Sequence, residues 1–279
     1  QFIGIHFFSP VEKMMLVEVI LGEKTGDKAL AVALDFAAAI KKTPIVVNDT
    51  RGFFVNRCVF RYMNESYDML IEGVPAIMIE NAAKMAGMPV GPLSLNDEVA
   101  IDLSLKIFKA SIADLGAQSV APSHLDLVVN MVEKLGRLGR KNGKGFYEYP
   151  AKPAKKFLWP ELKTLYPQLP ANKVDVKVLK QRFLVTIALE AARTVEEGII
   201  TDPREADVGS ILGFGFAPYT GGALSYIDGM GVKAFVELAE RLASQYGDHF
   251  KPTPLLLDMA KKGDTFYGRF DPYAKKAAA

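Results

Sequence analysis

The feature of this sequence that most restricts its fold is an internal repeat. The segment NRCVFRYMNESYDMLIEGV (56–74) aligns without a gap to QRFLVTIALEAARTVEEGI (181–199). Four pairs of identical residues mark the match: Arg57 with Arg182, Glu65 with Glu190, Glu72 with Glu197, and Gly73 with Gly198. Self-similarity of this kind indicates a duplicated supersecondary unit. We therefore expect two related helical units in one chain.

The similarity extends beyond these segments after an insertion. AGMPVGPLSLND (86–97) corresponds to LGFGFAPYTGGALSYID (212–228), with Gly87 opposite Gly213 and Pro92 opposite Pro218. GFGFAP loosely imitates a dinucleotide fingerprint, but it follows a helical segment rather than a strand. We interpret it as a tight turn between helices. RKNGKGFY (140–147) lacks the spacing of a phosphate-binding loop and is also interpreted as a turn.

The first fifty residues have a different pattern. Short apolar runs at 2–5, 16–20 and in TPIVVNDT (43–50) predict strands, and the alanine-rich segment 26–42 predicts a helix. A turn at Ser9-Pro10 separates the first two strands. Because an intact domain seldom opens on a core strand, we expect the chain to be a fragment that lacks what preceded it.

From residue 53 onward the apolar residues recur at helical spacing, most clearly over 53–72. The predicted fold class is therefore an α/β remnant, the end of an α/β sheet, followed by two tandem and mostly α-helical domains. The predicted boundaries are 1–50 for the α/β part, 51–150 for the first helical domain, 151–172 for a linker with an aromatic hairpin-like patch before it, and 173–279 for the second helical domain.

Composition excludes several function classes. The chain has 279 residues, of which 49% are hydrophobic and 24% charged, as in an ordinary soluble globular protein. With 34 basic and 32 acidic residues, neither a nucleic acid nor a membrane surface is an expected partner. No apolar run is long enough for a membrane span. The chain has one cysteine, Cys58, so an internal disulfide and a cysteine-based zinc site are excluded. Cys58 is expected to be a packed thiol. No metal site and a cytoplasmic location are predicted.

Three histidines are candidates for chemistry. His124 and His249 are expected to be solvated, whereas His6 lies between apolar residues of a strand and needs a partner. It could be a core histidine bonded to the backbone. Glu18 favours another interpretation, because it interrupts an otherwise apolar strand where an unpaired carboxylate is costly. If the two strands are adjacent, Glu18 fixes the imidazole tautomer and leaves the other ring nitrogen to accept a proton.

Asn56 is the third candidate residue. An asparagine near the start of a helix is commonly a cap or a surface residue. However, Asn56 lies inside the apolar stripe of the 53–72 helix, where its amide could orient a polar substrate. Both interpretations stay open.

Taken together, GIHFFSPVEKMMLVEVI, DTRGFFVNR, GMPVGPLSLND and RKNGKGFYEY resemble the L-3-hydroxyacyl-CoA dehydrogenase family. The tandem helical repeat is similar to that of the multifunctional fatty-acid β-oxidation enzymes, such as the α subunit of the bacterial complex. The resemblance covers essentially the whole chain. It implies that the α/β remnant consists of the C-terminal strands of a Rossmann-type NAD-binding domain. It also implies reversible, NAD-dependent oxidation of L-3-hydroxyacyl-CoA to 3-ketoacyl-CoA.

The resemblance also implies roles for individual residues. His6 would be the general base, Glu18 its carboxylate partner and Asn56 a substrate-binding residue. Ser9 is the one residue assigned to the cofactor, because the glycine fingerprint and a further site serine belong upstream of residue 1. The fragment is therefore expected to be nearly inactive alone. The second repeat has Gln181 in place of Asn56 and no such strand pair, so one active site is expected.

Further implications concern partners. The second repeat is expected to pack on the first as an internal pseudo-dimer partner. The resemblance also implies an upstream enoyl-CoA hydratase domain and a thiolase subunit as partner. Self-association through an exposed sheet edge is expected as well. The alternative function is a helical assembly or CoA-ester-binding module without catalysis. A dehydrogenase of a 3-hydroxy acid that lacks CoA is a related enzymatic alternative.

Overall fold

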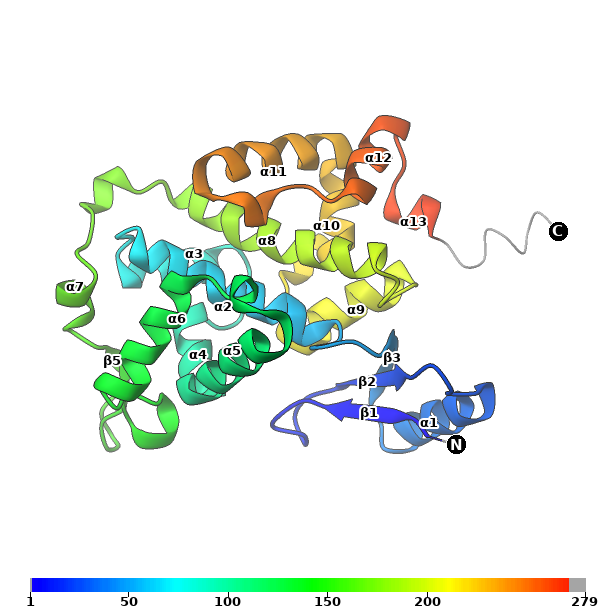
Figure 1. Cartoon of the computed structure of the whole chain (residues 1–279), viewed down its shortest axis with the longest axis horizontal. Coiled ribbons are helices and arrows are strands. Elements are labelled where there is room, and N and C mark those ends of the chain that lie inside the picture. The colour runs from blue at the N-terminus through cyan, green and yellow to red at the C-terminus, as the bar shows by residue number, and fades with distance from the viewer. Residues whose placement is uncertain (1, 271–279) are drawn as a thin grey trace. The chain divides into compact units, whose positions relative to one another are not determined.

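The computed structural model describes residues 2–270 and consists mainly of helices (Figure 1). It divides into two compact units. Of the described residues, unit 1 comprises 2–61 and 184–270, and unit 2 comprises Tyr62–Phe183. The boundaries fall inside two long helices, α2 (Val55–Ile71) and α8 (Val176–Glu196).

Unit 1 contains the predicted sheet. Its strands are β1 (Gly4–Phe7), β2 (Leu16–Leu21) and β3 (Thr43–Asn48), in the order β1-β2-β3. β1 is antiparallel to β2, and β2 is parallel to β3 through the crossover helix α1 (Asp27–Ala39). The three strands and the helix are confirmed. β1 begins two residues later than expected, and α1 ends three residues earlier because Lys41 adopts a φ of 58°, outside the helical region.

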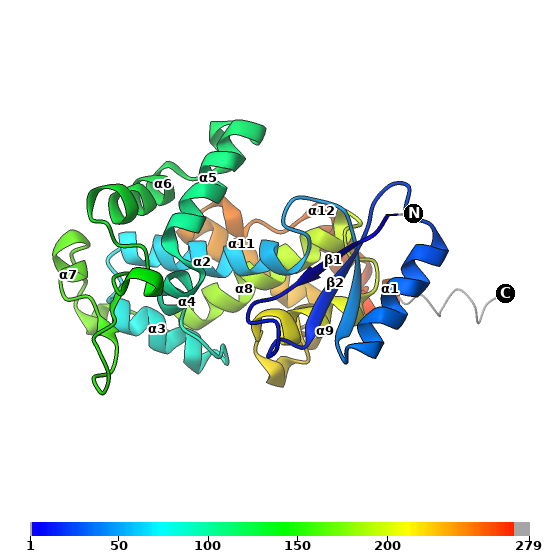
Figure 2. The same cartoon turned by 90° about the horizontal axis from the view of Figure 1, so that it is seen from below.

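Both faces of the sheet are covered by helices (Figure 2). The α1 helix buries Ala29, Ala33 and Ala37, which share one side of the helix because they are four residues apart. On the other side α9 (Pro203–Phe214) contacts β2 and β3. The Oε2 of Glu205 in α9 accepts a hydrogen bond from the Val46 N–H of β3 at 3.0 Å. A helix that lies more than 150 residues after the sheet in sequence thus covers one face of it.

The other elements of each unit are short helices and turns. In unit 1 the helices after α9 are α10 (Ala223–Met230), α11 (Val232–Tyr246), α12 (Pro254–Lys262) and α13 (Phe266–Arg269). In unit 2 they are α3 (Ala76–Met85), α4 (Pro92–Val99), α5 (Ile101–Leu115), α6 (Pro122–Val129) and α7 (Leu162–Leu165). The predicted aromatic hairpin is a short antiparallel pair, β4 (Tyr147–Glu148) with β5 (Phe157–Leu158).

In unit 2, two buried carboxylates join a helix start to the aromatic segment. Glu80 accepts the Leu93 N–H of α4 at 2.8 Å and the Tyr147 hydroxyl at 2.7 Å. Asp97 accepts the N–H groups of Phe146 and Tyr147, both at 2.8 Å. Burial raises the pKa of Asp97 to about 6 although these donors lower it.

Unit 1 contains the same arrangement at its own helix start. Asp207 accepts the Leu224 N–H of α10 and the Tyr267 hydroxyl, both at 2.8 Å. Asp228 accepts the N–H groups of Phe266 at 2.9 Å and Tyr267 at 3.2 Å. Each unit thus uses two carboxylates to tie a Leu-Ser helix start to a Phe-Tyr dipeptide.

This arrangement corrects one detail of the sequence alignment. The helix that follows the turn begins at Pro92 in unit 2 and at Ala223 in unit 1. Pro218 begins a separate 3-10 turn, so Ala223 rather than Pro218 is the counterpart of Pro92. The interpretation of GFGFAP as a turn is confirmed, because α9 ends at Phe214 and Gly215 caps it at a φ of 71°.

Cys58 and His124 both have buried side chains. Cys58 is fully buried, as predicted, and burial raises the pKa of its thiol well above the usual value. The prediction that His124 is solvated was wrong: its side chain is buried, and its Nε2 lies 2.7 Å from Asp68 Oδ1. The proline and serine before it do begin α6, but the buried side of that helix includes His124.

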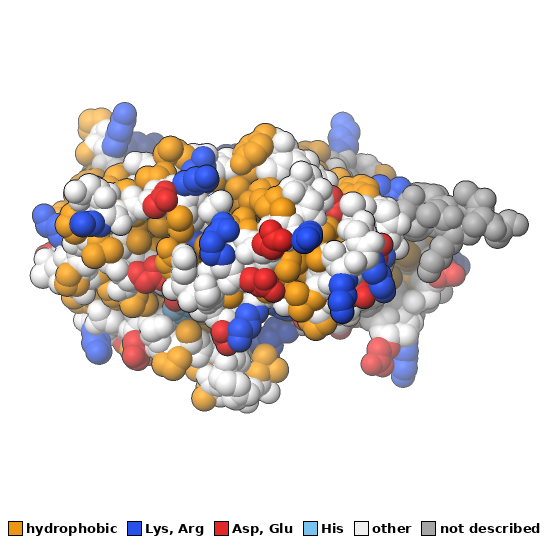
Figure 3. Space-filling view, turned by 90° about the horizontal axis from the view of Figure 1, so that it is seen from above, with side chains coloured by type: hydrophobic (Ala, Val, Ile, Leu, Met, Phe, Trp, Pro, Cys, Tyr) orange, Lys and Arg blue, Asp and Glu red, His pale blue; other side chains and the backbone are white. Residues whose placement is uncertain are grey.

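The surface shows no segregation of charge on the face drawn in Figure 3, where basic and acidic side chains alternate. No helix within residues 2–270 is long and apolar enough to cross a membrane.

Candidate active site

His6 and Glu18 occupy directly opposed positions of β1 and β2. Opposed residues of an antiparallel pair project from the same face of the sheet, so their side chains can meet. His6 Nδ1 lies 2.7 Å from Glu18 Oε2. The two candidates that sequence reasoning paired are therefore in hydrogen-bond contact.

Glu18 is fully buried and receives two further donors. Its Oε1 accepts the backbone N–H groups of Phe54 at 3.1 Å and Val55 at 2.9 Å. These amides lie at the start of α2, where N–H groups have no partner within the helix and the helix dipole favours negative charge. Three donors thus compensate the buried carboxylate, and the start of α2 helps to fix its position.

The imidazole of His6 is held on its other sides by aromatic rings. Its ring centroid lies 4.6 Å from that of Phe8 and 5.7 Å from that of Phe53. The side chain is 28% exposed, and within residues 2–270 its Nε2 has no hydrogen-bond partner. When Nδ1 donates to Glu18, Nε2 carries a lone pair that can accept a proton.

The segment that leads into α2 has an unusual backbone. Phe53, which contacts the His6 ring, has a φ of 47°, and Gly52 before it has a φ of 79°. A left-handed conformation is costly for a residue with a side chain, and such outliers concentrate at functional sites. Here the turn directs the following amides towards Glu18.

The other two candidates, Asn56 and Ser9, form no hydrogen bond with His6 or Glu18. Asn56 lies in the first turn of α2 and is partly buried, next to Val55. Ser9 lies in the loop after β1 and is exposed. Their roles in binding stay predictions.

A dinucleotide would need a site for its phosphates as well as a catalytic group. The strand-to-helix turn between β2 and α1 does not fit phosphates, because Thr25 closes it: the Thr25 hydroxyl accepts the Gly22 N–H and donates to the Phe2 carbonyl, both at 3.0 Å. Asp27 adds a negative charge in the first turn of α1. This turn therefore supplies no phosphate cradle beside the histidine pair.

Sequence reasoning missed the contribution of α9. Glu205, Gly209 and Gly213 are spaced by four residues and therefore lie on one side of the helix. A Cβ added at Gly209 would lie 2.7 Å from Ile45 and 3.0 Å from Phe54, and one at Gly213 would lie 2.9 Å from both Leu16 and Val55. The spacing is visible in the sequence, but nothing there indicates what the glycines face.

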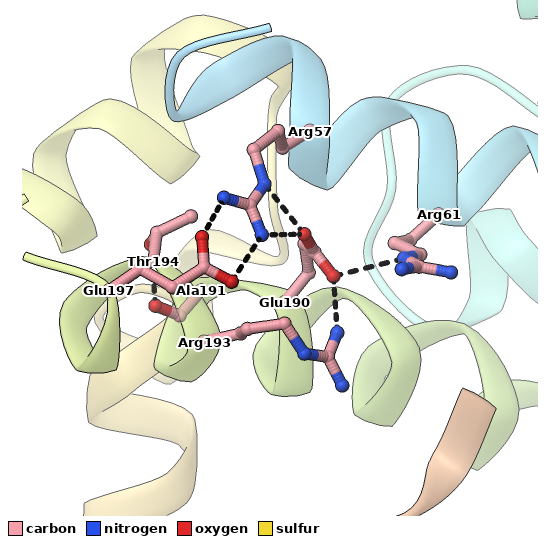
Figure 4. Close-up of polar contacts among 7 residues, drawn as sticks. All are labelled: Arg57, Arg61, Glu190, Ala191, Arg193, Thr194 and Glu197. Carbon is pink, nitrogen blue, oxygen red and sulfur yellow. Dashed lines mark hydrogen bonds and ion pairs between the residues drawn. The ribbon is translucent and has the colours of Figure 1, made fainter. Parts of the chain in front are cut away.

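An ion-pair cluster lies one turn into α2 (Figure 4). Arg57 donates from Nε to Glu190 Oε1 at 2.8 Å and also contacts Glu197. Arg61 and Arg193 approach the second Glu190 oxygen at 2.9 and 2.5 Å. Burial of Glu190 opposes its ionisation, but the three guanidinium groups outweigh this effect and lower the pKa of Glu190.

Unit 2 contains an ion-pair cluster at the repeat-matched positions. Arg182 donates from Nε to Glu65 at 2.5 Å and from Nη2 to Glu72 at 2.8 Å. The sequence alignment matched Arg182 with Arg57 and these glutamates with Glu190 and Glu197. Arg182 is thus paired with Glu65 and Glu72 in unit 2 as Arg57 is paired with Glu190 and Glu197 in unit 1.

Comparison with known proteins identifies related sequences over most of the chain. Residues 1–50 match the family described as 3-hydroxyacyl-CoA dehydrogenase, NAD binding domain, and residues 52–149 match its C-terminal domain. The fatty acid oxidation complex subunit alpha of Shewanella loihica is 43% identical over 265 residues, and that of Shewanella amazonensis is 44% identical over 267 residues. These matches cover 95% of this chain but only 37% of each relative.

Solved structures share the fold. A 3-hydroxybutyryl-CoA dehydrogenase from Escherichia coli K12 matches with a TM-score of 0.72 at 22% identity, over 94% of this chain and 70% of that protein. The dehydrogenase part of multifunctional enzyme 1 from C. elegans matches with a TM-score of 0.66 at 25% identity, over 92% and 59%. Both are similar to this chain along nearly its whole length.

Proposed function

The chain belongs to the 3-hydroxyacyl-CoA dehydrogenase family, and we propose that it forms the catalytic-base and helical part of an NAD-dependent L-3-hydroxyacyl-CoA dehydrogenase of fatty-acid β-oxidation. The observation that carries this proposal is the buried Glu18 carboxylate bonded to His6 Nδ1 at 2.7 Å. This pairing leaves Nε2 available for proton transfer.

In the proposed reaction His6 is the general base. Its Nε2 removes the proton of the C3 hydroxyl as the alcohol becomes a ketone, and returns it in the reverse direction. When bound, NAD would supply the acceptor for the hydride that leaves C3. Glu18 holds the tautomer in which Nδ1 carries the hydrogen, and its charge stabilises the imidazolium that forms. Because the described turn does not fit dinucleotide phosphates, only this proton transfer is assigned to the chain.

Asn56 and Ser9 complete the proposal for the site. Asn56 is proposed to orient the substrate, since it follows directly on the Val55 amide that binds Glu18. Ser9 is proposed to contact the cofactor from the loop that follows the His6 strand.

The proposed organisation is an α/β part at 1–50, helical domains at 51–150 and 173–279 and a linker at 151–172. The two helical domains would derive from one duplicated ancestor. Support comes from the carboxylates that tie a helix start to a Phe-Tyr dipeptide in each unit, and from the Arg-Glu-Glu clusters at matched positions. One active site is proposed, because a His-Glu strand pair precedes only the first helical domain.

The same family resemblance supports an acyl-CoA substrate, a cytoplasmic location and a thiolase subunit as partner. Self-association through the edge of β1 that pairs with no strand of residues 2–270 is a further part of the proposal.

A chimera provides the test of this function. Residues 1–279 would replace the matching part of the Shewanella loihica relative, and NADH oxidation would be followed with acetoacetyl-CoA and with free acetoacetate. We expect turnover of the CoA ester by the chimera and none by residues 1–279 alone. Turnover of free acetoacetate at an equal rate would favour the substrate that lacks CoA. A folded chimera without turnover, beside an active parent, would favour the non-catalytic module.

A further inference from the structure

The start of α2 is the point on which the geometry of the His-Glu pair depends. Glu18 is bound on one side by His6 and on the other by the Phe54 and Val55 amides. A displacement of these amides would leave a buried carboxylate oxygen without donors, which is costly. Whatever sets the backbone position of Val55 therefore also sets the position of Glu18.

The α9 helix packs directly against this point. Gly213 faces Val55 so closely that an added Cβ would lie 2.9 Å from Val55 Cγ2 and 3.1 Å from Val55 Cγ1. Both branches of the valine face the glycine, so a rotation about χ1 would bring one methyl group in place of the other. Valine is also restricted to few rotamers at the start of a helix. Relief of the contact therefore requires a shift of the Val55 backbone.

The α9 helix itself cannot move away easily. Glu205, two turns before Gly213, is hydrogen-bonded to the Val46 N–H of β3. Between them, a Cβ at Gly209 would meet Ile45 and Phe54 at 2.7 and 3.0 Å. The helix is thus held against the sheet along its length, and a bulkier residue at its end would push on α2.

We propose that Gly213 is a positioning residue for the His6–Glu18 pair: the absence of a side chain at this point of α9 lets the first turn of α2 lie where its amides bind Glu18. This inference rests on the proposed function for its catalytic meaning. In this proposal α9, which belongs to the second repeat, supports the position of the His6–Glu18 pair without contributing a side chain to it.

The chain offers a matched control. Gly229 is also a helical glycine of unit 1, and a Cβ added there would meet nothing within 4 Å. Alanine is ordinarily preferred over glycine inside a helix. Gly229→Ala is therefore expected to be neutral or stabilising, whereas Gly213→Ala is expected to disturb the start of α2.

The experiment is amide hydrogen exchange on residues 1–279, measured residue by residue without substrate or cofactor. Gly213→Ala should speed exchange of the Phe54 and Val55 amides by about tenfold or more, because exchange reports local opening. The amides of Leu238 and Ala239 in α11 are the reference for global unfolding. Gly229→Ala should leave all four rates within about twofold of those of the unmodified chain.

A double variant tests the contact itself. In a Val55→Ala background, the further change Gly213→Ala should alter the two α2 rates by no more than about twofold, because the clashing methyl groups of Val55 are gone and the remaining close atom, Leu16 Cδ2, is the end of a flexible side chain that can move aside. The proposal is overturned if Gly213→Ala leaves the Phe54 and Val55 rates unchanged, or speeds them only in proportion to the α11 rates. Since no catalysis is measured, this failure is distinct from the failure of the chimera to turn over.

Discussion

Glu18 is the residue on which the site depends. It is a fully buried carboxylate with three donors, of which one is a side chain and two are backbone amides. The side-chain partner could be predicted from sequence, because a carboxylate in an apolar strand needs a partner and the neighbouring predicted strand carries a histidine. The two amides could not, since backbone donors at a helix start have no residue-specific pattern.

The first prediction concerns Glu18→Gln. The glutamine Oε1 can still accept the Phe54 and Val55 amides, but its NH₂ group would face His6 Nδ1. The imidazole would then accept at Nδ1 and carry its hydrogen on Nε2, so that it could not take a proton from substrate. We expect a fall in chimera turnover of about 10³-fold or more, by analogy with removal of the carboxylate charge in a catalytic triad.

The control for this variant is thermal unfolding of the same protein, which should stay close to that of the unmodified chimera. Turnover within about tenfold of the unmodified rate would exclude tautomer control by Glu18.

The second prediction uses the raised pKa of Asp97. Its ordinary value of 3.8 rises to about 6 on folding through burial. The folded state therefore binds the proton more tightly than the unfolded state, and this carboxyl makes the protein less stable as pH rises from about 4 to 6. The contribution lost over this window is about 3 kcal/mol, at about 1.4 kcal/mol for each pH unit.

Asp97→Asn removes this titration. The free energy of unfolding of the unmodified chain, minus that of Asp97→Asn, should fall between pH 4 and pH 7, as measured by urea unfolding at each pH. A difference that stays constant or rises over this range would contradict the raised pKa.

Residue identity alone also misled at His124. Its partner, Asp68, comes from a distant part of the sequence and from another helix. A histidine near a helix start is indeed commonly exposed, and only the packing of α6 reveals that this one is buried.

At the scale of elements, the repeat predicted which arginine and glutamate positions correspond, but not that each arginine pairs with glutamates of the other copy. Arg57 of the first copy bonds to Glu190 and Glu197 of the second, and Arg182 of the second bonds to Glu65 and Glu72 of the first. This reciprocal exchange is the pattern of a self-complementary interface. A sequence alignment cannot distinguish it from pairing within each copy.

The third prediction compares two ion pairs of unit 2. Arg182 and Glu65 are almost completely buried, whereas Lys109 and Glu133 are largely exposed. Arg182→Met removes the guanidinium that donates to the buried Glu65 carboxylate and should lower the free energy of unfolding by about 3–5 kcal/mol. Lys109→Met should change it by about 1 kcal/mol or less.

Urea unfolding of both variants at neutral pH provides the measurement. Equal effects of the two substitutions would mean that the Arg182 pair contributes no more than a surface ion pair.

For the molecule as a whole, the sequence predicted the sheet and the switch to helices, and the division into two repeated helical domains stays a prediction. The sequence did not predict that the compact units would divide at Arg61 and Leu184, inside α2 and α8. Long helices that are continuous in sequence give no local signal of such a division. Nor did it predict the contact of α9 with the sheet, because the glycines that permit this contact lack side chains that would mark a buried surface.

The rate of NADH oxidation with acetoacetyl-CoA by the His6→Ala chimera tests most directly whether His6 performs the proton transfer. We expect turnover to fall by about 10²- to 10⁴-fold, the usual contribution of a general base, while the melting temperature stays nearly unchanged. Turnover retained at the unmodified rate in a folded protein would contradict proton transfer by His6 and assign the His6–Glu18 pair a purely structural role.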